Sequence, residues 1–88
     1  MKTVAVRTIK RADADTTKAL GHAGVSTVHE AQGRIGLMKP YMRPIYAGAR
    51  VSGTAITVLA QPGDNWMLHV AIELCQPGDM LVVACTTD

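Results

Sequence analysis

The second half of the chain carries two apolar runs with the composition of buried strands. The first, "VSGTAITVL" at residues 51–59, is rich in β-branched side chains and lies between Gly48 and Pro62. The second, "MLVVAC" at residues 80–85, follows the turn sequence "PGD". Runs of this kind between turn residues are typical of strands that are buried on both faces. We therefore expect strands over residues 51–59 and 80–85.

Between these runs, apolar residues recur at the spacing of a helix. Asp64 or Asn65 stands where an N-cap residue is needed, directly after a Pro-Gly turn. Four residues fall three or four positions apart and so share one helical face, namely Leu68, Ala71, Ile72 and Cys75. A strand, a helix and a strand in this order predict a parallel βαβ unit.

The first half of the chain has a helical pattern that is interrupted by glycine. Residues 14–36, "ADTTKALGHAGVSTVHEAQGRIG", predict two short helices with a break between Gly21 and Gly24. The candidate N-caps are Asp15 or Thr16 for the first helix and Ser26 or Thr27 for the second, and Gly33 and Gly36 end the second. Residues 37–50 contain Pro40, Pro44 and Gly48, which predicts a loop.

Two strands are too few to cover a hydrophobic core. In open α/β sheets ligands bind beyond the carboxyl ends of the strands, and the sequence stops at residues 86–88, where such a binding loop begins. We therefore expect an α/β fold with a central sheet, cut off after a strand-helix-strand unit. Residues 1–88 then form the N-terminal portion of a single domain.

Charge and cysteine content argue against several classes of partner. The formal net charge is +2, and only Lys10 and Arg11 are adjacent basic residues, so there is no basic stripe for nucleic acid. Cys75 and Cys85 form no C-x-x-C pair, which argues against a disulfide framework or a zinc site. The chain has neither a signal-peptide pattern nor an apolar run of roughly 20 residues. We expect a cytoplasmic protein with no membrane partner.

Candidate chemistry is concentrated on polar residues of the predicted helices. Asn65, His69 and Glu73 are four positions apart and project in one direction, and a histidine and a carboxylate so placed could bind a metal or relay a proton. The alternative is a solvated helix face with a cap at its start. For His29 and Glu30 the two interpretations are a polar helix face and a carboxylate turned into a neighbouring pocket. Nucleotide-binding, Walker and nucleophile-elbow motifs do not occur in the sequence.

Three motifs resemble those of a known family. They are Val28-His29-Glu30-Ala31, Lys39-Pro40-Tyr41-Met42-Arg43-Pro44-Ile45 and Gly63-Asp64-Asn65-Trp66-Met67. With them, the chain from Val6 onward closely resembles the N-terminal half of the 4-hydroxy-4-methyl-2-oxoglutarate / 4-carboxy-4-hydroxy-2-oxoadipate aldolases. Those enzymes share the RraA-like fold of the regulators of ribonuclease activity, an α/β domain with a central sheet that assembles as a trimer.

The resemblance implies a class II pyruvate aldolase. Such lyases cleave a tertiary-alcohol oxo-acid to pyruvate and a second oxo-acid, and they also decarboxylate oxaloacetate. Both reactions pass through a pyruvate enolate, whose charge Mg²⁺ or Mn²⁺ stabilises as a Lewis acid. In the family, the metal and the pyruvate are held by a Gly-x-x-Gly-acidic loop and an Arg-Asp pair that lie downstream of the second predicted strand. We therefore expect the metal ligand after Asp88, no catalytic or metal-binding residue within residues 1–88, and no activity from these residues alone.

The resemblance also suggests substrate-binding residues, which are Asn65, His69 and Glu30. They line the family's pocket, often across a subunit interface, while Asp64 is expected to cap the helix. The implied partners are a small oxo-acid and two further copies of the chain in a homotrimer. The alternative is a non-catalytic regulator of ribonuclease activity that binds a protein. Polar residues at 29–30 and 64–66 favour the aldolase.

Overall fold

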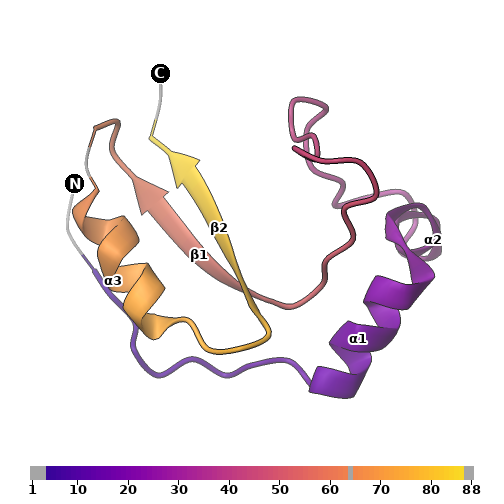
Figure 1. Ribbon diagram of the computed structural model, residues 1–88, viewed down its shortest axis with the longest axis horizontal. Coiled ribbons are helices and arrows are strands. Elements are labelled where there is room, and N and C mark those ends of the chain that lie inside the picture. Colours follow the sequence, from indigo (N-terminus) through magenta and orange to yellow (C-terminus); the bar gives the residue numbers. More distant parts are fainter. Residues whose placement is uncertain (1–3, 64, 87–88) are drawn as a thin grey trace. The chain divides into compact units, whose positions relative to one another are not determined.

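The computed structural model describes residues 4–63 and 65–86. This part of the chain contains α1 (Ala14–Ala23), α2 (Val25–Ala31), β1 (Thr54–Ala60), α3 (Trp66–Leu74) and β2 (Asp79–Cys85), as Figure 1 shows. Two compact units are present. The sheet unit comprises Met1–Ala12 and Gly53–Asp88, and the helix unit comprises Asp13–Ser52. The expected α/β class is confirmed.

The strands β1 and β2 pair in parallel, as the strand-helix-strand pattern predicted. The register runs from Thr54 opposite Asp79 to Ala60 opposite Cys85. The first strand begins at Thr54 rather than at the predicted residue 51. Because β2 begins at Asp79, directly after a turn, residues before Thr54 have no strand opposite them.

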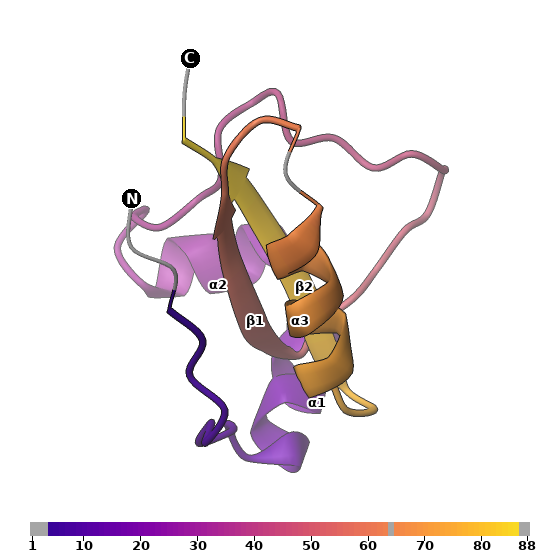
Figure 2. The same cartoon turned by 90° about the vertical axis from the view of Figure 1, so that its left-hand side faces the viewer.

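The hydrophobic core of the sheet unit lies between β1 and α3. Ile56, Val58 and Ala60 occupy alternate positions of β1 and are buried, together with Ala71 of α3. Four partly buried residues pack against them, namely Ile9, Met67, Leu68 and Cys75. Figure 2 shows α3 lying alongside the two strands. The alternation along β1 thus places one set of side chains under the helix and the other set in solvent.

The prediction that Ile72 belongs to the apolar face of this helix is wrong. Ile72 is 56% exposed, whereas Ala71 is buried and Met67 packs against the core. Successive side chains of a helix are rotated by about 100°. Since α3 turns Met67 and Ala71 toward β1, Ile72 points away from the core.

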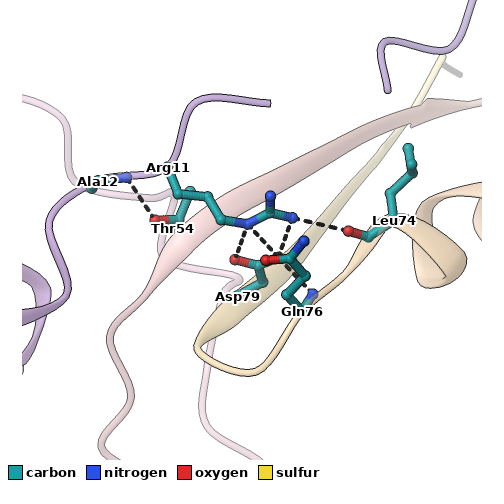
Figure 3. A network of polar contacts seen from close by, with 6 residues as sticks. All are labelled: Arg11, Ala12, Thr54, Leu74, Gln76 and Asp79. Atoms are coloured by element: carbon teal, nitrogen blue, oxygen red, sulfur yellow. Dashed lines mark hydrogen bonds and ion pairs between the residues drawn. The ribbon is translucent and has the colours of Figure 1, made fainter. Parts of the chain in front are cut away.

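A polar network joins the N-terminal segment to the turn before β2 (Figure 3). The Arg11 Nε donates to both carboxylate oxygens of Asp79, at 3.0 and 3.1 Å, and its Nη2 donates to Asp79 Oδ2 at 2.8 Å and to the Leu74 carbonyl at 2.9 Å. Asp79 also accepts from the Gln76 backbone N–H at 2.8 Å. Its side chain is only 2% exposed. We call these contacts the Arg11–Asp79 clasp.

The clasp changes the acidity of both partners. The hydrogen bonds from Arg11, followed by the one from the Gln76 N–H, hold the pKa of Asp79 below its ordinary value. The same carboxylate raises the pKa of the Arg11 guanidinium. Both shifts favour the charged pair. Next to it, the Ala12 backbone N–H donates to the Thr54 hydroxyl at 3.1 Å, so the segment is also tied to the start of β1.

The helix unit starts at a cap that differs from the two predicted ones. Asp13, rather than Asp15 or Thr16, is the N-cap of α1, and it accepts from the Thr16 backbone N–H and hydroxyl, both at 3.0 Å. These bonds lower the pKa of Asp13. An Asp three residues before a free backbone N–H satisfies one of the donors left open at a helix start.

A single glycine separates the two helices of this unit. Gly24 has φ +89°, and α2 begins at the next residue, so the predicted caps Ser26 and Thr27 are wrong and lie inside the helix. Gly21 lies within α1 rather than in the break. After α2, Gly33 adopts φ +82°, in line with its predicted role as a helix stop. Neither α1 nor α2 contains a buried residue.

Candidate functional site

The carboxyl edge of the β1–β2 pair is where α/β folds place ligands. β1 ends at Ala60, and the connection to α3 begins there. The backbone N–H of Thr86, just after β2, donates to the Ala60 carbonyl at 2.8 Å. Because α3 begins at Trp66, shortly after β1 ends, the start of this helix comes next in the chain after the carboxyl edge of the sheet.

Asn65 is the N-cap residue of α3, but its side chain makes no capping hydrogen bond. Its backbone has φ −93° and ψ −6°, which is helical, whereas capping side chains usually belong to an extended residue. The exposed Asn65 amide is thus not occupied by the helix end. The predicted capping role of Asp64 lies outside the described residues.

α3 brings Asn65 and His69 onto consecutive turns of one helix. The His69 backbone N–H donates to the Asn65 carbonyl at 3.2 Å, and both residues are exposed. Glu73, one turn further on, is exposed as well. The shared polar face inferred from the spacing is present, and substrate binding by Asn65 and His69 stays a prediction.

Glu30 belongs to the other unit, on α2. Its two carboxylate oxygens accept from Nη2 and Nε of Arg34, both at 2.9 Å. The side chains remain 63% and 74% exposed, so the pair is a surface ion pair. The hydrogen bonds that Arg34 donates to the Glu30 carboxylate raise the pKa of Arg34. A role for Glu30 in a substrate pocket stays a prediction, and Arg34 is the partner that the sequence analysis missed.

An apolar groove of about 500 Å³ lies within the sheet unit. It is formed by the segment from Val4 to Ile9, by β1 and by the inner face of α3. Among the described residues that line it, Thr57 and Gln61 are the only ones with polar side chains, and none of Asn65, His69 and Glu30 is included. A groove without titratable groups offers no acid, base or nucleophile. The polar face of α3 therefore remains the candidate site, and its part in any chemistry stays a prediction.

The described residues do not assemble a metal centre by themselves. Within residues 4–63 and 65–86, no group of three or more His, Cys, Asp or Glu side chains is placed to hold a metal ion. His69 and Glu73 supply one imidazole and one carboxylate, which is fewer than the ligands that a bound divalent ion takes from a protein and solvent. The described residues therefore do not fit a complete metal site, and the ligands of the expected ion stay a prediction.

The comparison with known families gives one finding. A family model described as Aldolase/RraA, of the RraA-like type, matches residues 6–88. The match spans all five helices and strands of the described chain. The RraA-like family includes both aldolases and regulators of ribonuclease activity. None of the helices in the described residues is long and apolar enough to cross a membrane.

Proposed function

This chain belongs to the RraA-like family (Aldolase/RraA), and on that premise we propose that it is part of a divalent-metal-dependent pyruvate aldolase. The proposed reaction is retro-aldol cleavage of 4-hydroxy-4-methyl-2-oxoglutarate or 4-carboxy-4-hydroxy-2-oxoadipate to pyruvate and a second oxo-acid. Oxaloacetate decarboxylation is the proposed second activity. The observation that carries the proposal is the exposed Asn65 amide, which follows the carboxyl edge of the sheet and is not used for capping.

Each candidate residue has a defined task in this proposal. The Asn65 amide N–H donates to an oxygen of the bound oxo-acid and fixes its orientation. His69, one turn further along α3, donates to a carboxylate of the same substrate. Glu30 is the third proposed substrate-binding residue, and its carboxylate accepts from Arg34 in this structure. A bound Mg²⁺ or Mn²⁺, whose ligands are expected after Asp88, would supply Lewis-acid stabilisation of negative charge on the substrate oxygen.

The metal and assembly requirements are the first test. We expect the domain, extended beyond residue 88 by the downstream loop and Arg-Asp motifs of the family, to form a homotrimer and cleave the oxo-acid with Mg²⁺ or Mn²⁺. EDTA should remove the activity and either ion should restore it, because the proposed stabilisation of negative charge comes from the ion. Pyruvate release is followed with a coupled dehydrogenase assay. Undiminished turnover in EDTA would contradict the proposed metal dependence.

The second test concerns Asn65. In the extended protein, Asn65→Ala is expected to lower kcat/KM for oxaloacetate decarboxylation by about ten- to a hundredfold, because a lost orienting contact raises the barrier without unfolding the helix. The melting temperature should change little, since the side chain makes no capping hydrogen bond. Gln76→Ala, which removes an exposed side-chain amide from the turn after α3, is the matched control. Equal kinetics for the two variants would remove Asn65 from the site.

A second candidate function rests on the exposed apolar side chains of the helix unit. In the loop after α2, Ile45 is 97% exposed and Tyr41 is 78% exposed. Neighbouring exposed apolar side chains are typical of protein-binding surfaces. This observation favours a regulator of ribonuclease activity, which the same family includes. Saturable binding of a ribonuclease, with no turnover of either oxo-acid by the extended protein, would support this alternative over the aldolase.

A further inference from the structure

A second concave site lies within the helix unit, and its lining includes none of Asn65, His69 and Glu30. A pocket of about 180 Å³ is lined by the second half of α1 and by the segment that leads out of the loop. Its lining residues are Lys18, Gly21, His22, Arg50, Val51 and Ser52. We propose that this basic pocket binds a small oxyanion with the chemistry of a phosphate group.

The charge of the lining is the first argument. Lys18, His22 and Arg50 are all basic, and no acidic residue lines the pocket. Among the described residues, the ion pairs are Arg11 with Asp79 and Arg34 with Glu30, so no carboxylate neutralises Lys18 or Arg50. The helix unit has five Lys or Arg residues and three Asp or Glu residues, which accounts for the whole net charge of the chain. An anion is therefore the ligand that the field of this pocket favours.

The hydrogen-bonding state of Arg50 is the second argument. Its Nη1 donates to the His22 carbonyl at 3.4 Å, which is longer than the usual range of about 2.7–3.2 Å. Arg50 therefore caps the end of α1 only weakly, and its planar fork retains donors for a ligand. The contact also offsets the partial negative charge at the end of the helix, which would otherwise repel an anion.

The shape of the pocket depends on a glycine. A Cβ added at Gly21 would overlap the Ser52 hydroxyl, so that hydroxyl lies directly against α1. This packing places a neutral donor beside the basic side chains. An arginine fork, a lysine point charge and a hydroxyl are a donor set that suits the three terminal oxygens of a phosphate group better than the flat carboxylate of an oxo-acid.

The test is a titration of the 88-residue protein followed by backbone amide NMR shifts. The probes are inorganic phosphate, glycerol 3-phosphate and malonate, each added at constant ionic strength because surface charge effects are screened by salt. We expect saturable shifts at residues 18–22 and 50–52 with both phosphates, and weaker binding of malonate. Tighter binding of the ester than of inorganic phosphate would identify a phosphomonoester as the natural ligand, and the reverse order would identify free phosphate.

Paired variants separate a site from general charge attraction. Lys18→Gln and Arg50→Gln are expected to weaken phosphate binding by about tenfold or more each, since each removes a charge-assisted hydrogen bond. Lys39→Gln and Arg43→Gln remove the same charges from the exposed loop and should leave binding unchanged. Lys18 makes no hydrogen bond within the described chain that its replacement would break, so Lys18→Gln tests the pocket even if Arg50→Gln loosens the helix end. Equal losses in all four variants, no saturable shifts at these residues, or malonate binding as tight as phosphate would overturn the proposal.

Discussion

The Gly53→Ala variant is expected to melt roughly 10 °C or more below the native chain, because overpacking is strongly destabilising where backbone must move. A Cβ at Gly53 would overlap the carbonyl oxygen of Gly78 and lie 3.3 Å from its carbonyl carbon. These two glycines stand immediately before β1 and β2. The new methyl group therefore pushes apart the starts of the two strands.

Gly33→Ala is the control for this prediction. A Cβ at Gly33 meets nothing within 4 Å, but the residue has φ +82°. That substitution should cost the left-handed strain of about 1–2 kcal/mol less the roughly 0.4–1 kcal/mol by which alanine lowers the entropy of the unfolded chain, so the net drop in melting temperature should be a few degrees. Thermal melts followed by circular dichroism compare the two variants. If Gly53→Ala melts at or above the temperature of Gly33→Ala, the close approach of the strand starts does not limit stability.

The Asp79→Ala variant is expected to show the second large effect, a melting temperature lower by roughly 10 °C. The substitution leaves the Arg11 guanidinium and the Gln76 N–H without their shared acceptor. Because the Asp79 side chain is 2% exposed, water replaces these bonds poorly. Asp15→Ala, which removes an exposed carboxylate from α1, should change the melting temperature far less.

The clasp also predicts how stability depends on pH. The pKa of Asp79 is lower in the folded chain than in the unfolded chain, so the unfolded chain binds more protons as the pH falls. Its contribution is complete above the unfolded value of about 3.9 and is lost as the pH falls through the lower folded value. Asp79→Asn should therefore remove part of the acid-induced drop in melting temperature. An unchanged acid limb in Asp79→Asn would contradict the assigned role of this carboxylate.

The elements of the sheet unit could be predicted from the sequence because each is specified by the residue types within its own segment. The β-branched run before Pro62 and the apolar run after Asp79 became the two strands, in parallel register. The predicted start of the first strand and the predicted burial of Ile72 were wrong. Both depend on how α3 and the turn before β2 pack against β1. Such choices are set by tertiary packing rather than by the sequence nearby.

The two ion pairs were also beyond what the local sequence pattern could predict. Glu30 and Arg34 are four positions apart, but Arg34 lies beyond the end of α2 with φ +62°, so the pair does not come from helical spacing. The Arg11–Asp79 pair joins residues 68 positions apart and has no local signal. For the candidate site, spacing identified the polar face that Asn65 and His69 share. It held no information on Arg50, whose importance comes from its place beside α1.

The unpaired edge of β2 bears on the colloidal behaviour of the protein. In the part of the chain that the structure describes, β2 pairs with β1 alone, so its other edge presents open backbone donors and acceptors. Natural edges are usually blunted by lysine or proline, but residues 80–85 contain neither and carry no charge. Short uncharged apolar segments of this kind promote cross-β stacking between molecules. We therefore expect association between copies, where it occurs, to begin at β2 when no other strand covers this edge.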